Sequence, residues 1–155
     1  MRYLLLLIST IFLFCCSEKV EFSDRDRAAV EQIRKDYVSG WLQNDQKKIL
    51  TLFNENATIV PSGLFPMKGI EQITKYWFPD NGSTTTIHSY AVELINLKGT
   101  DSMAYSLEKG TLNFTYTFND FTMTKESTSH ATTIYQKNKD GKWEITSRMW
   151  TSLDE

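Results

Sequence analysis

The chain has 155 residues, with 17 lysines and arginines against 19 aspartates and glutamates, and its formal net charge is −2. This length corresponds to a single domain, and the near balance of charge argues against a nucleic-acid-binding protein, which needs a concentrated basic surface. The two cysteines are adjacent, which excludes a disulfide-stapled scaffold and a cysteine-based zinc site. With 41% hydrophobic and 13% aromatic residues, the composition is typical of a globular protein with a packed core.

The N-terminal residues have the pattern of an export signal. Arg2 precedes an apolar run over 4–14, LLLLISTIFLF, which is too short to span a membrane but has the length of a signal-peptide core. The run ends at Cys15 and Cys16, and the next residues are polar. This pattern resembles a bacterial lipoprotein signal, in which a cysteine after the apolar stretch is acylated, and Leu13 lies three residues before Cys16, as such signals require.

The resemblance implies three parts: a lipoprotein signal peptide over 1–15, a tether over 16–23 and a folded domain over 24–155. Lipidation at Cys16 would attach the protein to the bacterial cell envelope, at the outer membrane rather than the inner one. The alternative is an ordinary cleaved signal peptide with two incidental cysteines.

Three helices are predicted in the first half of the domain. Apolar residues at spacings of three and four predict a helix over 24–42, which begins after a capping signature at Ser23. Asn44 and Asp45 break that pattern and cap a short second helix, and 54–56 are predicted as a turn before a strand over 57–60. A third helix follows Gly69 and ends at 79–82.

The second half of the chain is dominated by β-branched and aromatic residues. Four strands are predicted there, over 86–96, 102–118, 121–137 and 142–151. Asn119 and Asp120 form a two-residue hairpin turn between the second and third of these strands. Three helices followed by long antiparallel hairpins predict an α+β fold.

The order of these elements resembles the nuclear transport factor 2-like superfamily, which includes SnoaL-like and ketosteroid-isomerase-like domains. The resemblance rests on Trp41, Asp45, the segment LFNENAT over 52–58, Pro61, Gly69, Ile73 and the segment DGKW over 140–143. It implies a cone-shaped, strongly bent antiparallel sheet wrapped over three N-terminal helices and enclosing a pocket. A fold of this kind hosts enzymes, ligand binders and interaction domains, so it does not by itself define a function.

The resemblance also allows the isomerase site to be compared residue by residue. Tyr37 occupies the position of a pocket tyrosine in members related to ketosteroid isomerase. The base position falls at Val60 or Pro61 and the second acid near Ala131, and none of these side chains can exchange a proton. Isomerisation of that kind is therefore not expected.

Several side chains are candidates for a ligand pocket or for chemistry. His88 shares strand parity with Tyr90 and Val92, and it is the best single candidate for a catalytic group, although a buried structural histidine is the more common case. His130 is expected to be exposed. The predicted ligand-pocket residues are Tyr37, Trp41, Tyr76, His88, Arg148 and Trp150.

For other side chains, and as an alternative for Arg148, the sequence favours a structural or surface role. Trp77 is interpreted as core, and Glu108 as a solvated strand residue. Arg148 and Trp150 are predicted on the strand face opposite Trp143, where Arg148 could instead be a surface residue or pair with Glu108 or Glu144.

Three functions remain open. The first is an envelope lipoprotein whose pocket binds a small, partly apolar molecule without an identifiable catalytic set. The second is a SnoaL-like enzyme that uses His88, or less readily Glu108, as the proton-transfer group, with Tyr37 or Arg148 polarising an oxygen. The third is a homodimerising or protein-docking domain with a hydroxyl-rich sheet. No cofactor, metal site or nucleic-acid partner is expected.

Overall fold

The structure is a computed structural model that describes residues 21–153, so the predicted leader and Cys16 lie outside the described residues. None of the helices in this range is long and apolar enough to cross a membrane. In chain order the elements are α1 (Asp24–Leu42), α2 (Gln46–Leu50), β1 (Phe53–Val60), β2 (Met67–Lys68), α3 (Gly69–Trp77), β3 (Thr84–Gly99), β4 (Met103–Phe118), β5 (Phe121–Lys137) and β6 (Trp143–Ser152).

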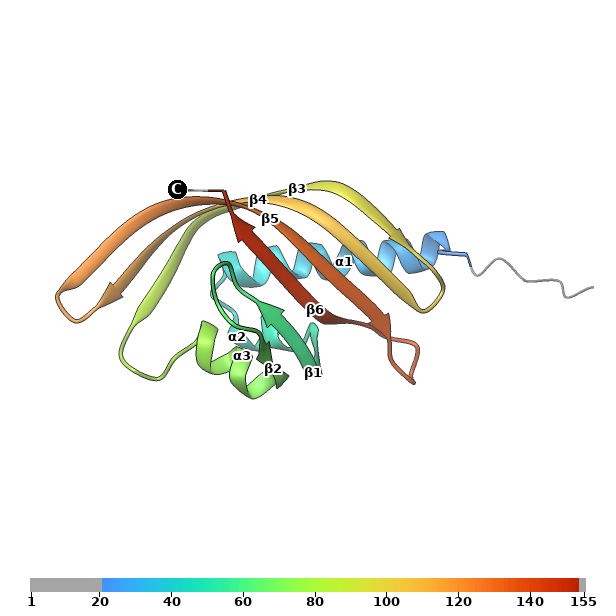
Figure 1. Ribbon diagram of the computed structural model, residues 1–155, viewed down its shortest axis with the longest axis horizontal. Helices are drawn as coiled ribbons and strands as arrows, with labels where there is room; N and C mark the ends of the chain where they lie inside the picture. Colours follow the sequence, from blue (N-terminus) through green and yellow to red (C-terminus); the bar gives the residue numbers. More distant parts are fainter. Residues whose placement is uncertain (1–20, 154–155) are drawn as a thin grey trace, which may run out of the picture.

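The strands of this range form one sheet in the order β2-β1-β6-β5-β4-β3. β1 runs parallel to β6, and every other neighbouring pair is antiparallel. Figure 1 shows the long strands β3, β4 and β5 bending over α1, while α2, α3 and the short strands lie below it. The prediction of an α+β cone with a bent antiparallel sheet over three helices is confirmed.

Helix α1 has the bounds that its apolar spacing predicted, and local chemistry sets both of its ends. At the start, the Ser23 hydroxyl accepts a hydrogen bond from the Asp26 backbone N–H at 3.1 Å. Just past the end, Asn44 has a φ of 52°, a left-handed conformation that asparagine tolerates better than most residues. A Cβ on Gly40 would lie 2.7 Å from Ile49 Cγ1, so a glycine is needed where α2 packs against α1.

The strands differ from the prediction where tertiary pairing decides the structure. Residues 54–56, predicted as a turn, belong to β1, in a region where its register with β6 shifts between Phe53 and Thr58. The strand therefore begins at Phe53, which pairs with Ile145. Strand β2 was not predicted because two residues carry no periodic signal, and it is defined only by its pairing with β1.

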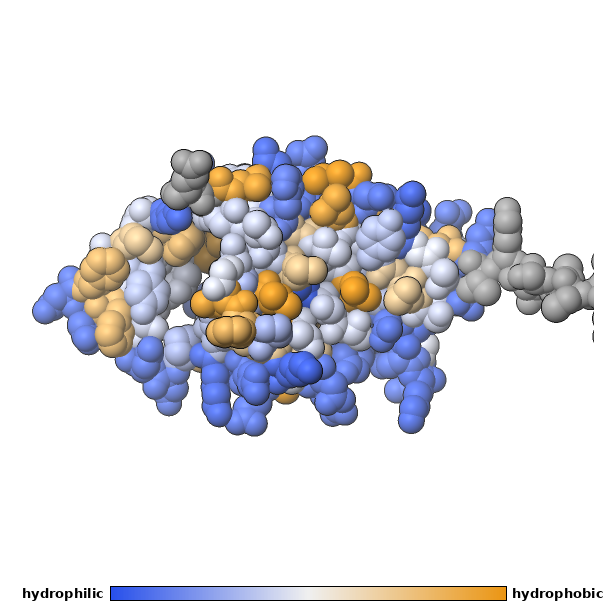
Figure 2. All heavy atoms as spheres, in the orientation of Figure 1, coloured by the Kyte–Doolittle hydropathy of each residue, from blue (hydrophilic) through white to orange (hydrophobic). Residues whose placement is uncertain are grey.

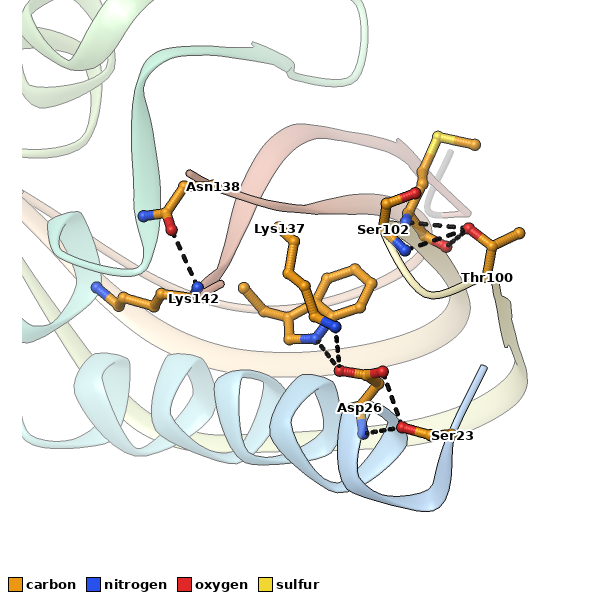
Figure 3. A network of polar contacts seen from close by, with 9 residues as sticks. Ser23, Asp26, Thr100, Ser102, Lys137, Asn138 and Lys142 are labelled. Carbon is orange, nitrogen blue, oxygen red and sulfur yellow. Dashed lines mark hydrogen bonds and ion pairs between the residues drawn. The ribbon is translucent and has the colours of Figure 1, made fainter. Parts of the chain in front are cut away.

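A partly buried polar network joins the start of α1 to the end of β5 and the start of β6 (Figure 3). The Asp26 carboxylate accepts a hydrogen bond from the Trp143 indole N–H at 2.9 Å, and it forms an ion pair with Lys137 at 2.7 Å. The Ser23 hydroxyl donates to its other oxygen at 2.8 Å. The hydrogen bonds from Lys137 and Trp143 lower the pKa of Asp26 to about 2. The network thus holds the helix to the sheet through one carboxylate.

Asp26→Asn should destabilise the protein at pH 7 by about 2 kcal/mol, because a native pKa near 2, against 3.8 in the unfolded chain, stabilises the folded state only while the carboxylate is ionised. That contribution is fully present above about pH 5 and is lost as the pH falls from about 4 to 2. The free energies of urea unfolding of the two proteins should therefore converge over this range.

The control for this measurement is Asp120→Asn, in the exposed β4–β5 hairpin. It should change the unfolding free energy by less than about 0.5 kcal/mol at any pH. An equal loss for both variants, or a difference at Asp26 that does not shrink in acid, would contradict the role assigned to the network.

Candidate ligand-binding site

A cavity of about 410 Å³ opens between the helices and the concave face of the sheet. We call it the aromatic cavity, because rings from α1, α3, β3, β4 and β6 make up half of its lining residues, and Arg148 is the charged residue among the rest. Figure 2 shows the molecule hollowed between the tip of the β4–β5 hairpin and the helices. The rings are those of Tyr37, Trp41, Tyr76, Trp77, Tyr90, Phe114 and Trp150.

The rings support one another, so the wall is built before any ligand arrives. Trp41 and Trp77 meet edge to face with ring centroids 5.4 Å apart, and Trp77 stacks on Trp150 at 6.5 Å. Tyr37 lies edge-on to Trp41 at 6.1 Å. Such contacts add stability beyond the area they bury. Trp77, predicted as core, is half-buried and also lines the cavity.

Five of the six predicted pocket residues lie together in this lining. They come from α1, α3 and β6, segments far apart in the sequence, and their role in ligand binding stays a prediction. These residues are Tyr37, Trp41, Tyr76, Arg148 and Trp150.

The sixth residue, His88, does not line the aromatic cavity. Ile87 pairs with Phe114 and Ser89 with Asn113, so His88 is the extra residue of a β-bulge in β3. It is exposed, and its Nε2 lies 2.7 Å from the hydroxyl of Thr115. The parity argument for His88 was wrong because the bulge interrupts the alternation of side chains. His130 is exposed, as expected.

A second bulge places Arg148 on the concave face. Ile145 pairs with Tyr135 and Ser147 with Ile134, which leaves Thr146 unpaired in β6. Trp143, Ile145, Arg148 and Trp150 consequently share the inner face, whereas strict alternation had put the last two opposite the first two. Arg148 therefore faces the cavity, as expected. The reason is the bulge at Thr146 and not the strict alternation of side chains along the strand.

Arg148, in the wall of the aromatic cavity, belongs to a group of three charged side chains from three elements, which we call the arginine–glutamate cluster; its other two members, Arg34 and Glu108, lie behind this wall. Glu108 of β4 accepts a hydrogen bond from Arg34 Nε with one oxygen and forms an ion pair with Arg148 Nη1, at 3.3 Å, with the other. The exposed fractions of these side chains are 15% for Arg34, 4% for Glu108 and 7% for Arg148. The sequence interpretation of Glu108 as a solvated residue was wrong.

The three side chains of the cluster together carry a net charge of +1. Two arginines, which remain protonated in proteins, face one carboxylate. The nearby tyrosines do not balance this charge, because burial raises the pKa of Tyr135 to about 12 and that of Tyr90 further. Their hydroxyls therefore stay protonated at neutral pH.

The remaining polar groups around Arg148 are hydroxyls. Arg148 Nη1 also donates to Thr133 Oγ1, and Nη2 lies 3.4 Å from the Tyr90 hydroxyl. The guanidinium lies over the Tyr37 ring, 4.6 Å from its centroid, a cation–π contact that holds its plane. A Cβ on Gly110 would lie 3.3 Å from Tyr90 Cε2. The glycine therefore lets the Tyr90 ring pack directly against the backbone of β4.

Sequence reasoning did not single out Arg34, although a signal for it was available. It lies three residues before Tyr37 and seven before Trp41, and is therefore on the same face of α1. Glu108 likewise shares strand parity with Ser106 and Gly110, which are both buried. An unbroken parity over β4 would have placed Glu108 inside.

Within the part of the chain that the structure describes, no group of three His, Cys, Asp or Glu side chains could hold a metal ion. The positions that correspond to the isomerase base and acid, Val60, Pro61 and Ala131, provide no proton-exchanging side chain. What the aromatic cavity offers is a ring-lined wall and the hydrogen-bond donors of Arg148.

Comparison with known proteins gives the fold. No protein-family model and no curated protein matches the chain. Among solved structures, a ketosteroid isomerase-like protein from Erwinia carotovora atroseptica aligns with a TM-score of 0.72 at 11% identity, over 86% of this chain and 100% of that one.

Two further structures have the same fold. A nuclear transport factor 2-like protein from Cytophaga hutchinsonii aligns with a TM-score of 0.67 at 11% identity, over 82% of this chain and 98% of that one. Another, from Novosphingobium aromaticivorans, aligns with a TM-score of 0.57 at 14% identity, over 84% and 83%. The described domain thus has the nuclear transport factor 2-like fold, which defines its architecture and leaves its activity open.

Glu108→Gln should destabilise the protein by about 3–5 kcal/mol in urea unfolding at pH 7, because it leaves two buried arginines without their shared carboxylate. The double variant Arg34→Gln/Glu108→Gln should recover part of that loss, since one of the two uncompensated charges is removed with it.

Glu93→Gln, an exposed position on β3, is the matched control and should be near neutral. Glu108→Gln with the stability of the parent protein would contradict the assignment of Glu108 as the counter-ion of both arginines.

Proposed function

We propose that the protein binds a small, partly apolar molecule with an acidic group in the aromatic cavity. The observation that carries this proposal is the uncompensated positive charge of the arginine–glutamate cluster, whose Arg148 lies in the wall of a ring-lined cavity. An anionic group at Arg148 would neutralise that charge where water is largely excluded, and the rings would cover the apolar part of the ligand.

The volume and lining fit this class of ligand. A cavity of about 410 Å³ is within the range of small-molecule sites, and such sites combine apolar walls with a few placed polar groups. The Tyr37 hydroxyl has no hydrogen-bond partner among residues 21–153 and lines the same cavity, so it can donate to a second ligand atom.

The arrangement supports binding more than acid–base catalysis. An enzyme of the SnoaL-like kind would need a free base, and the two candidates were His88 and Glu108. His88 lies outside the aromatic cavity, and both oxygens of Glu108 are held by arginines. Glu108 is also absent from the lining of the aromatic cavity, so neither candidate is placed to reach a ligand there.

Isothermal titration with 2-naphthoate and with neutral 2-naphthalenemethanol tests this proposal. The carboxylate should bind about 10- to 100-fold more tightly than the alcohol, the ratio expected for hydrogen bonds to a charged group. Arg148→Gln should abolish that preference, since it removes the excess charge and leaves Arg34 paired with Glu108. Trp150→Ala should weaken both ligands alike.

His88→Ala is the matched control and should bind both compounds as the parent protein does. Equal affinity for the acid and the alcohol, or an acid preference that survives in Arg148→Gln, would contradict the proposal.

We also propose that the protein is held at the cell envelope by a lipid on Cys16. The leader pattern that ends at Cys16 supports this proposal. Phe22 packs against Trp143, 6.0 Å between ring centroids, and only six positions separate it from Cys16, at most about 20 Å of chain. α1 begins at the end of the molecule opposite the β4–β5 hairpin, near which Phe114 lines the cavity. The cavity would then face away from the membrane.

Labelling with radioactive palmitate in a bacterial host tests the anchor. The parent protein and the matched control Cys15→Ala should incorporate label and partition into detergent, whereas Cys16→Ala should do neither. Label retained in Cys16→Ala would exclude Cys16 as the acylated residue.

A further inference from the structure

We propose that a second cavity, behind the arginine–glutamate cluster, binds a small aliphatic carboxylate, and that anions in the two cavities weaken each other's binding. This cavity has a volume of about 420 Å³ and lies between the C-terminal half of α1 and strands β3 to β6. Tyr37 and Arg148 line both cavities, so these two side chains form the common wall.

The walls of the two cavities differ in chemistry. Branched aliphatic side chains supply most of the apolar residues of the second cavity, which we call the aliphatic cavity, and no tryptophan lines it. Leu42 and Leu94 are 45% and 36% exposed at its rim, a degree of exposure that an alkyl chain would reduce. The aliphatic residues are Val38, Leu42, Val92, Leu94 and Ile145.

The polar part of the aliphatic cavity is cationic. Arg34, Lys35 and Arg148 line it, against the single carboxylate of Glu108. Arg34 uses its Nε on Glu108, and neither of its terminal amino groups has a partner among residues 21–153. A guanidinium with two free donors at the edge of an apolar cavity matches the geometry of a carboxylate, which can accept both.

The two sites are coupled through the charge they share. Glu108 holds Arg34 with one oxygen and Arg148 with the other, and the cluster has one uncompensated positive charge. The first anion, in either cavity, neutralises that charge. A second anion would leave Arg34, Arg148, Glu108 and the two ligands with a net negative charge in a largely buried place, where charge repulsion is poorly screened. Lys35, which is exposed at the edge of the aliphatic cavity, offsets little of this charge because solvent screens it. The antagonism rests on the proposed function of the aromatic cavity, whereas the second site does not.

Titration of the full chain with octanoate tests the second site. Leu94→Asp places a negative charge at the rim of the aliphatic cavity and should weaken octanoate binding at least 10-fold. Because Leu94 is exposed and solvent screens the new charge, 2-naphthoate binding should fall by less than the fivefold expected of a bound anion. The neighbouring Ile95→Asp, exposed and outside both cavities, is the matched control and should change neither. Leu42→Asp, on α1, should repeat the result from the opposite rim if the β3 variant folds poorly.

The coupling is measured as the octanoate affinity with and without saturating 2-naphthoate. We expect it to fall about fivefold or more, the lower end of typical coupling between sites, and the reciprocal titration should give the same factor. If Trp150→Ala weakens octanoate binding and Leu94→Asp does not, octanoate occupies the aromatic cavity, and the proposal of a second site is overturned. Octanoate that responds to Leu94→Asp but is indifferent to 2-naphthoate overturns the coupling alone. A failure of 2-naphthoate to bind would contradict the proposed function and leave the Leu94→Asp comparison decisive for the second site.

Discussion

The arrangement of this molecule depends on one carboxylate placed between two arginines. Glu108 on β4 holds Arg34 of α1 and Arg148 of β6, so three elements distant in sequence meet at a single residue. Removing three charges from water is expensive, and the cost is offset only because the groups face one another and because Thr133 and Tyr90 supply further hydrogen-bond partners. The cluster lies inside the cone, between the aromatic and the aliphatic cavity.

The same cluster lies between the aromatic and the aliphatic cavity. The arginines and Tyr37 form a polar partition across the space that α1 and the sheet enclose, with rings on one side and aliphatic side chains on the other. The tyrosine hydroxyls beside it remain neutral at physiological pH, because burial raises the pKa values of Tyr90 and Tyr135. The net positive charge of the cluster is therefore not cancelled by ionised tyrosines, and both proposed sites would bind an anion next to it.

Sequence reasoning reached most of the fold because the signals for it are local. Spacing defined α1, the Ser23 cap defined its start, and β-branched runs defined the long strands. The site was less accessible, because it depends on two bulges, at His88 and Thr146, that reverse strand parity. Bulges follow from how neighbouring strands pair, and the sequence carries no periodic trace of them. The wrong placement of His88 and the wrong reason for the position of Arg148 have this one cause.

The central claim is that the cone holds an acidic ligand at the arginine–glutamate cluster, and a crystal structure of the protein with 2-naphthoate tests it most directly. The account predicts the naphthalene rings among Trp41, Trp77 and Trp150, with a carboxylate oxygen about 3 Å from the Arg148 guanidinium. Naphthoate bound with its carboxylate at the cavity mouth in solvent, or absent from the aromatic cavity, would contradict it.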